Sequence, residues 1–109
     1  MVIIEFGDVA VAAGGAYSSK PRPVLVFQDT TIFTGESVVV IPFTSFKNPA
    51  IKTRLSITPT QDNGLDRACY LEVDKISAID RSCIAGRIGR LTEKELEWAR
   101  LCATKLLRL

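Results

Sequence analysis

The chain has 109 residues, 47% of them hydrophobic, and its 14 basic and 12 acidic residues give a net charge of +2. This length fits a single core, so we expect residues 1–109 to form one domain. No apolar run approaches the roughly 18 residues that cross a bilayer, and the N-terminus lacks a signal-peptide pattern. These absences lead us to expect a cytoplasmic protein without a membrane partner.

The sequence contains no histidine, and its three cysteines are far apart in the chain. Without histidine, the chain cannot build a serine triad, a histidine acid–base pair or a histidine metal site. An odd number of separated cysteines argues against both a disulfide framework and a zinc site. We therefore expect a site without metal or cofactor, made from arginine, lysine, hydroxyl or carboxylate side chains.

Short apolar segments separated by turn signals follow one another along most of the chain. Residues 2–12 predict one bent strand or two short ones, with Gly7 at the bend, and residues 14–19 predict a flexible loop. The runs at 23–28 and 37–43 are almost continuously apolar, which indicates strands buried on both faces. Alternating patterns predict further strands at 54–58, 69–73 and 75–79.

The C-terminal segment carries the clearest helix signal. Thr92 and Glu95 have the spacing of a capping box, and apolar residues recur at helical spacing from Leu96 to Leu106. Additional leucines near the end of the chain would add apolar surface for a partner interface. Together, the elements predict a mainly β protein with α structure: a small SH3-like β-barrel with a C-terminal α-helix.

Arg22 lies between two prolines at the start of the apolar run 23–28. Each proline fixes its own φ and biases the residue before it toward extended backbone, so Lys20 and Arg22 are held out of the helical region. A planar guanidinium with so little backbone freedom suits bidentate binding of a phosphate. An edge strand that begins with a solvated arginine would produce the same pattern.

Acidic residues are absent from residues 9–28 and 37–61, although the whole chain is nearly neutral. If these two segments meet in the fold, their cations form an electropositive concavity that suits nucleic acid. An ordinary solvated surface is the other interpretation. The cations of the two segments are Lys20, Arg22, Lys47, Lys52 and Arg54.

Six short motifs occur in one order along nearly the whole chain: EFGDV at 5–9, RPVLV at 22–26, VVVIPFTS at 38–45, GLDR at 64–67, DKISAID at 74–80 and GRIGRL at 86–91. This order resembles the MazF/PemK family of toxin endoribonucleases. The resemblance implies the toxin of a type II toxin–antitoxin system, a homodimer that cleaves single-stranded RNA. It also implies a cognate antitoxin protein as the inhibitor.

The resemblance gives Arg22 and Thr44 the catalytic roles, because family members carry an arginine at this strand start and a threonine at the end of the third main strand. Attack of the RNA 2′-hydroxyl on the adjacent phosphate develops negative charge, which a guanidinium stabilises without a metal. The Thr44 hydroxyl would orient a phosphoryl oxygen, although threonine is also common at strand ends. Family chemistry implies either a 2′,3′-cyclic phosphate with a 5′-hydroxyl or a 3′-hydroxyl product.

The loop before Arg22 lacks the Gly-Ser-Glu-Gln-like stretch that family members carry, so no general base is assigned. Phe43 is expected in the core, whereas Phe46 beside a basic groove could stack on an unpaired base. Asp74 would accept from a base edge or form a surface salt bridge. The residues expected to bind RNA are Ser19, Lys20, Ser45, Phe46, Lys47, Lys52, Arg54, Asp74 and Lys75.

Two other functions fit parts of the pattern. A noncatalytic SH3-like module that binds RNA or protein would keep the basic surface without needing Arg22 and Thr44 to cooperate. A CcdB-like gyrase inhibitor would share the fold, but CcdB toxins contact gyrase through a tryptophan-containing tail. This chain ends in Leu-Leu-Arg-Leu, and its one tryptophan, Trp98, lies inside the predicted helix, which counts against that function.

Overall fold

The computed structural model describes residues 3–14, 17–32 and 35–109, and for residues 17–19 it describes the backbone alone. Within these ranges, seven strands precede one α-helix, α1 (Glu93–Leu107), and two short 3-10 turns, η1 (Val73–Lys75) and η2 (Arg81–Cys83), interrupt the strands. The strands are β1 (Asp8–Gly14), β2 (Tyr17–Val26), β3 (Ser37–Thr44), β4 (Arg54–Ile57), β5 (Cys69–Glu72), β6 (Ser77–Asp80) and β7 (Ile84–Arg90).

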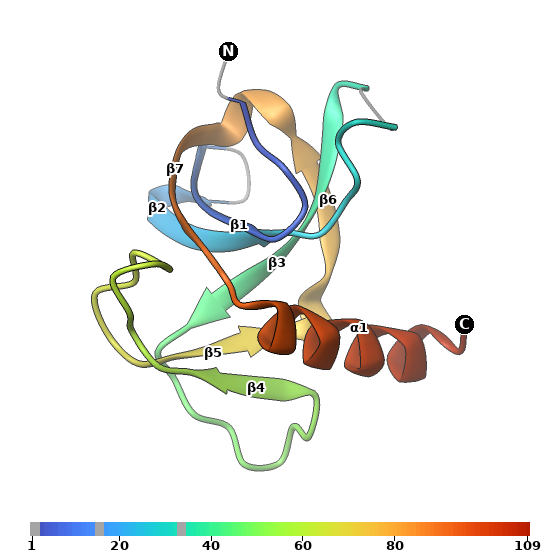
Figure 1. Cartoon of the computed structure of the whole chain (residues 1–109). Coiled ribbons are helices and arrows are strands. Elements are labelled where there is room, and N and C mark those ends of the chain that lie inside the picture. The colour runs from blue at the N-terminus through green and yellow to red at the C-terminus, as the bar shows by residue number, and fades with distance from the viewer. Residues whose placement is uncertain (1–2, 15–16, 33–34) are drawn as a thin grey trace.

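The strands pair antiparallel in the order β4-β5-β3-β2-β1-β7, and β6 also pairs with β3 (Figure 1). The predicted mainly β architecture with a C-terminal helix is therefore confirmed. The sheet does not close into a barrel, because β4 and β7 stand at opposite ends of the order and do not pair in the described part of the chain. β2 also begins earlier than predicted, so strand structure takes over residues 17–19 of the expected loop.

The third strand changes its partner at a proline. Residues 37–40 of β3 pair with β6, whereas Phe43 and Thr44 pair with β5. Pro42 lies between these two stretches and pairs with Val24 of β2 on the other edge. Proline has no N–H to donate to a neighbouring strand. Pro42 is tolerated here because β6 has already ended and β5 has not yet begun to pair on that edge of β3. This change of partner carries the end of β3 away from the upper sheet toward the β4–β5 ribbon (Figure 1).

The central strands β2 and β3 bury both of their faces. Leu25, Ile41 and Phe43 belong to the larger core, which also contains the buried apolar residues of α1, β4 and β5. Val24 and Val40 belong to a second core on the opposite face. This arrangement explains why both strands read as nearly continuous apolar runs, and it confirms Phe43 as a core residue.

The helix begins at the predicted cap. The Thr92 hydroxyl accepts from the Glu95 amide at 3.1 Å, and the Glu95 carboxylate accepts from the Thr92 amide at 2.9 Å. Leu96, Ala99 and Ala103 are buried against the larger core, whereas Leu106 is 40% exposed, so the apolar stripe is shorter than predicted. Within the described residues, no helix has the length and apolarity to cross a membrane.

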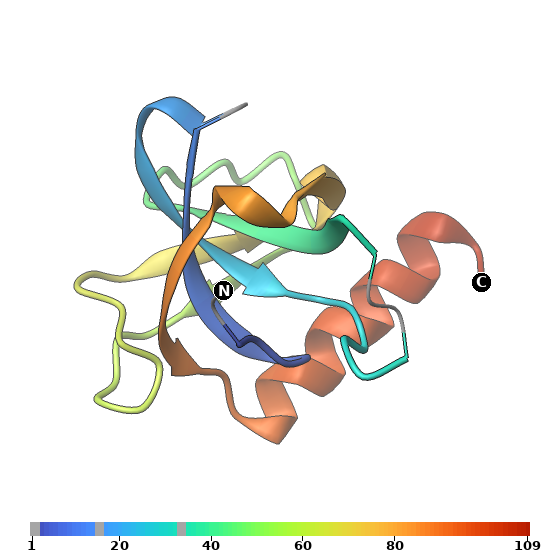
Figure 2. The same ribbon diagram turned by 90° about the horizontal axis from the view of Figure 1, so that it is seen from above.

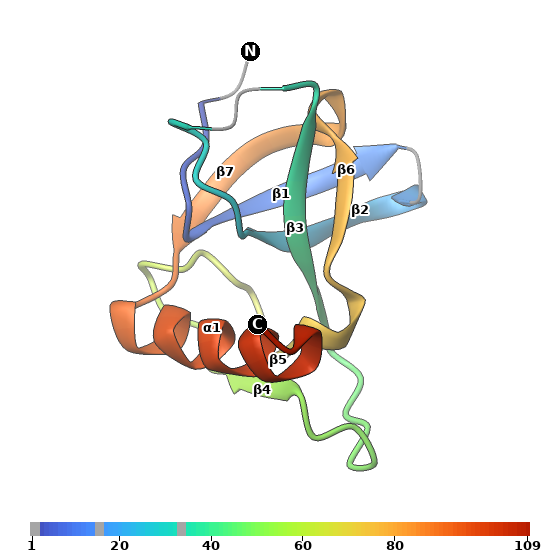
Figure 3. The same cartoon turned by 90° about the vertical axis from the view of Figure 1, so that its right-hand side faces the viewer.

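The helix lies beneath the strands and beside the β4–β5 ribbon, so it covers the larger core from one side. Figure 2 gives the view from above, in which α1 ends with the C-terminus clear of the sheet. Figure 3, from the side, shows α1 lying along β4 and β5. The helix therefore covers the larger core with its buried residues.

Candidate functional site

Arg22 and Thr44 occupy opposing positions at the end of the β2–β3 ladder. The paired residues are Val26 with Val40, Leu25 with Ile41 and Val24 with Pro42. Two residues farther out, the same register sets Arg22 opposite Thr44, beyond the last pair. Both residues line one cavity of about 220 Å³. The structure thus brings the two predicted catalytic residues together, along with Lys20 and Ser45, which line the same cavity.

The Arg22 side chain is exposed and has no ion-pair partner within the described residues. Its backbone is held on one side by β1, where it pairs with Ala12, and Pro23 pairs with Val11. Pro21 and Pro23 remove two backbone donors on the side where β3 has ended. The result is a fixed strand end that presents an uncompensated guanidinium to the cavity.

The Thr44 hydroxyl has a defined direction. Its oxygen accepts a hydrogen bond from the Phe46 amide at 3.2 Å, which closes a small turn at the end of β3. Because that bond uses the oxygen as an acceptor, the hydroxyl proton remains available to donate. Thr44 can therefore offer a hydrogen bond to an anion that Arg22 attracts.

The third wall of the cavity is the loop after β4, whose residues were not predicted to belong to the site. Asp66 and Arg67 line the cavity and form an ion pair at 3.4 Å, with side chains that are 84% and 68% exposed. Although the GLDR motif contributed to the family resemblance, nothing in its composition indicated that it would face Arg22. Only the tertiary fold brings this loop to the end of β2.

The loop carrying Asp66 is anchored by a buried asparagine. Asn63 is 1% exposed, and its side chain accepts from the amides of Thr60 and Leu65 and donates to the Thr58 carbonyl. The next residue, Gly64, has φ +70, and a Cβ there would lie 2.1 Å from the Ile88 carbonyl oxygen. Close contact with β7 therefore requires glycine here.

Cys69 also lines the cavity, and its side chain is almost entirely buried. Burial raises the pKa of the Cys69 thiol, and the charge of Asp66 raises it further, whereas Arg67 opposes the shift. The thiol donates to the Arg67 carbonyl at 3.2 Å. These conditions keep Cys69 protonated, so it is not an activated nucleophile.

A second cavity has a volume of about 230 Å³ and is lined by Lys47, Lys52, Arg54 and Tyr70. Its lining residues are adjacent in sequence to those of the first cavity, since Tyr70 directly follows Cys69. Phe46 precedes Lys47 and is 69% exposed. Of the predicted RNA-binding residues between 45 and 54, Ser45 lines the first cavity and Lys47, Lys52 and Arg54 line the second, and the exposed Phe46 lies between Ser45 and Lys47 in the chain.

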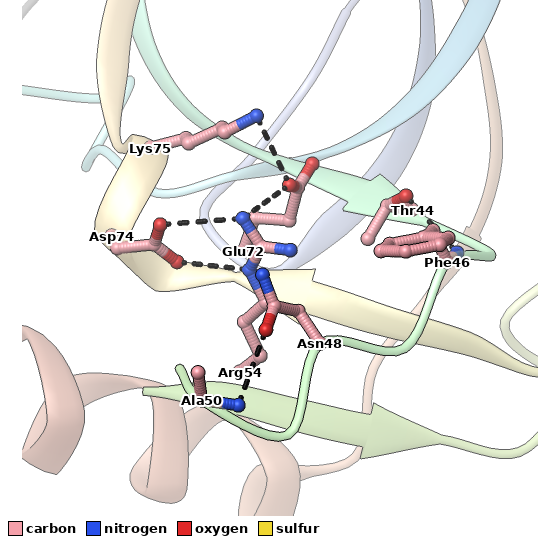
Figure 4. A network of polar contacts seen from close by, with 8 residues as sticks. All are labelled: Thr44, Phe46, Asn48, Ala50, Arg54, Glu72, Asp74 and Lys75. Carbon is pink, nitrogen blue, oxygen red and sulfur yellow. Dashed lines mark hydrogen bonds and ion pairs between the residues drawn. The ribbon is translucent and has the colours of Figure 1, made fainter. Parts of the chain in front are cut away.

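Arg54 is the exception among the five cations of the acid-free segments. Its guanidinium meets Glu72 at 3.0 Å and Asp74 at 3.3 Å, and its side chain is only 9% exposed (Figure 4). Lys75 completes the network at 3.4 Å from Glu72. Because the fold brings these acids in from β5 and η1, Arg54 forms structural ion pairs. The other four cations, Lys20, Arg22, Lys47 and Lys52, are exposed, and we call them the basic surface.

Asp74 and Lys75 belong to the same network, so their charges are already partnered. Figure 4 shows Asp74 turned toward Arg54. Asp74 was expected either to accept from a base edge or to form a salt bridge, and in the structure it forms a salt bridge with Arg54. Of the remaining predicted residues, Ser19 lies in β2 with a side chain outside the described part of the chain. Among the described residues, no group of three or more His, Cys, Asp or Glu side chains could hold a metal ion.

Comparisons with known proteins match most of the chain. The family described as PemK-like, MazF-like toxin of type II toxin–antitoxin system matches residues 2–106. A curated relative is the probable endoribonuclease MazF of Mycolicibacterium smegmatis (strain ATCC 700084 / mc(2)155). It is 42% identical over 91 residues, which cover 83% of this chain and 84% of the relative.

Solved structures share the fold at low sequence identity. The Mycobacterium tuberculosis toxin MazF-mt6 superposes with a TM-score of 0.78 at 18% identity, covering 94% of this chain and 97% of that one. An endoribonuclease in complex with its cognate antitoxin, from mycobacterial species, gives 0.79 at 18% identity, covering 98% and 97%. MazE–MazF from Deinococcus radiodurans gives 0.79 at 16% identity, covering 96% and 95%.

Proposed function

Since the chain belongs to the PemK-like, MazF-like toxins of type II toxin–antitoxin systems, we propose that it is an endoribonuclease that cleaves single-stranded RNA. Cleavage is sequence-specific, needs no metal, and inhibits translation and growth. Its substrate, mRNA, places the activity in the cytoplasm. Residues 1–109 act as one domain in this proposal.

The observation that carries the proposal is the opposition of Arg22 and Thr44 across one cavity. When the 2′-hydroxyl attacks the adjacent phosphate, negative charge grows on the phosphoryl oxygens. The Arg22 guanidinium stabilises that charge, and the Thr44 hydroxyl donates to the phosphate and fixes its orientation. The backbone of Arg22 is held by its pairing with Ala12, and the Thr44 oxygen is held by the Phe46 amide, so little backbone reorganisation is needed when RNA binds.

The neighbouring surface suits a flexible polyanion. Lys20, Lys47 and Lys52 are exposed cations, and Phe46 offers an exposed ring on which an unpaired base can stack. Tyr70 lines the second cavity beside Lys47 and Lys52. We propose that the RNA backbone runs from the Arg22 cavity past Phe46 toward these two lysines.

We also propose that the toxin acts as a homodimer and that a cognate antitoxin inhibits it by occupying the same basic surface. One relative of this fold was solved in complex with its cognate antitoxin. A disordered acidic segment would be attracted by the exposed cations and would bury apolar side chains on binding. Competition between a noncleavable RNA and the antitoxin segment for one labelled protein tests this; simultaneous, independent binding would refute shared occupancy.

The direct test is to incubate the purified protein with a long single-stranded RNA in EDTA and to map the cuts by primer extension. We expect cleavage at a recurring short sequence, undiminished by the chelator. Labelling of the fragments by polynucleotide kinase then identifies 5′-hydroxyl ends. Binding without cleavage would favour a noncatalytic module, and cleavage that required added magnesium would overturn the metal-free chemistry.

A further inference from the structure

The proposed chemistry lacks a proton acceptor, because the attacking 2′-hydroxyl must lose its proton. An arginine guanidinium and a lysine ammonium carry no acceptor site, which eliminates Arg22 and Lys20. The Thr44 oxygen already accepts from the Phe46 amide, and a neutral hydroxyl is a poor base. Cys69 stays protonated because burial raises its pKa.

Asp66 is the one carboxylate among the described residues that line the Arg22 cavity. Its Oδ1 atom meets the Nε atom of Arg67 at 3.4 Å, and its Oδ2 atom has no partner in the described part of the chain. A base whose one side is held by a third group, with the other side open to the nucleophile, has the arrangement that activates hydroxyl nucleophiles. Asp66 and Arg67 are arranged in this way.

The chemistry of RNA limits what a carboxylate can meet in this cavity. Phosphate oxygens only accept hydrogen bonds, so the groups that can donate to Asp66 are the 2′-hydroxyl and base N–H groups. The phosphate that Arg22 attracts brings its own ribose to the same cavity of about 220 Å³, which Asp66 also lines. The hydrogen-bond donor that this ribose carries next to the phosphate is its 2′-hydroxyl.

We propose that Asp66 is the general base of the cleavage reaction and that Arg67 is a positioning residue that orients its carboxylate. This inference rests on the proposed function. Asp66 takes the proton of the 2′-hydroxyl, the 2′-oxygen forms a bond to phosphorus, and the bond from phosphorus to the 5′-oxygen breaks. The leaving 5′-oxygen takes a proton from water, which gives a 2′,3′-cyclic phosphate and a 5′-hydroxyl.

The loop that carries Asp66 is anchored by contacts on both sides of the carboxylate, which a positioned base requires. Before it, Asn63 and Gly64 fix the chain against β7, and Leu65 is 8% exposed in the larger core. After it, the Cys69 thiol donates to the Arg67 carbonyl. The exposed Asp66–Arg67 pair therefore projects from an anchored turn.

The test compares Asp66→Asn with Asp62→Asn, an exposed aspartate in the preceding turn that does not line the cavity. Single-turnover cleavage is measured beside binding of the same RNA with a 2′-deoxy nucleotide at the cut. We expect Asp66→Asn to slow cleavage by about 10²-fold or more, as for loss of a general base, with RNA binding equal to or tighter than wild type. Asp62→Asn should cleave like wild type.

Arg67→Gln should slow cleavage less than Asp66→Asn and should add little in the double variant, because both residues act through one carboxylate. The assignment of Asp66 as the general base would be overturned if the Asp66→Asn variant cleaved at the wild-type rate, or if its cleavage fell only in proportion to its RNA binding. If Arg22→Ala is slow while Asp66→Asn is not, the inference fails and the proposed function stands. If the wild-type protein does not cleave, the proposed function itself fails.

Discussion

Arg22 and Thr44 face each other across the open end of the β2–β3 ladder, two residues beyond the pair formed by Val24 and Pro42. The ladder ends here because Pro21 and Pro23 lack backbone donors and because β3 turns away to pair with β5. The same features that stop strand pairing therefore leave the cavity that both side chains line.

The buried ion pair between Arg54 and Glu72 gives a first prediction about stability. Glu72→Ala leaves Arg54 with Asp74 alone in a mostly buried setting, and breaking a buried pair costs on the order of 3–5 kcal/mol. We expect urea denaturation to show a loss toward the lower end of this range, because Asp74 remains. Glu97→Ala removes the exposed partner of Arg100 and should cost less than about 1 kcal/mol. Equal losses in the two variants would contradict the structural role of Arg54.

Gly64 provides a second prediction. Gly64→Ala places a side chain at φ +70 and drives its Cβ into the Ile88 carbonyl, so we expect a loss of about 2 kcal/mol or more. Gly86→Ala is the matched control, because a Cβ there meets no atom of the described residues within 4 Å. Its stability should stay level or rise by about 0.4–1 kcal/mol. Comparable thermal unfolding of the two variants would argue against a fixed Asn63–Gly64 turn.

Cys69 yields a prediction about thiol reactivity. Because burial and the Asp66 charge raise its pKa, the thiol stays protonated at neutral pH, and the thiolate that reacts with iodoacetamide is scarce. Mass-spectrometric mapping should show that Cys83 and Cys102, both partly exposed, are modified first. Asp66→Asn removes one cause of the raised pKa and should accelerate labelling of Cys69. Fast labelling of Cys69 in the folded wild type would contradict its placement.

The exposed lysines give a prediction about salt. Lys47→Glu and Lys52→Glu should each weaken binding of a noncleavable single-stranded RNA and reduce the slope of log affinity against log salt by roughly 0.7 for each phosphate that is no longer neutralised. Lys105→Glu, on the last turn of α1, serves as the control and should leave affinity and slope unchanged. Fluorescence anisotropy across a salt series measures both quantities. An equal effect from all three reversals would show that only net charge matters.

Local patterns predicted most of the fold, because their signals depend on nearby residues. The cap at Thr92 and Glu95 and the doubly buried runs of β2 and β3 are properties of short segments. β7 was not predicted, since Gly86, Gly89 and two arginines interrupt its apolar pattern. A Cβ on Gly89 would lie 2.3 Å from the Asn63 carbonyl carbon, so glycine is needed here for close packing against the Asn63 loop. That loop is distant in the sequence, and local periodicity cannot predict the contact.

The candidate site was predictable only in part for the same reason. Arg22 and Thr44 could be paired through the family resemblance, and the structure brings them to one cavity. The partners of Arg54 could not be predicted, because Glu72 and Asp74 arrive through strand pairing and the η1 turn. Asp66 and Arg67 reach the cavity only through the anchored loop, and a charged turn in a sequence looks the same whether or not it faces a site.

The most direct test of the account is single-turnover cleavage by Arg22→Ala and Thr44→Ala, measured beside the binding of a noncleavable RNA. Loss of one preorganised donor to the transition state should slow cleavage by about 10²- to 10³-fold, with a much smaller change in affinity. Arg22→Lys should recover little, since an ammonium cannot reproduce the bidentate guanidinium. Near wild-type cleavage by either alanine variant, or a loss that only follows weaker binding, would contradict the account.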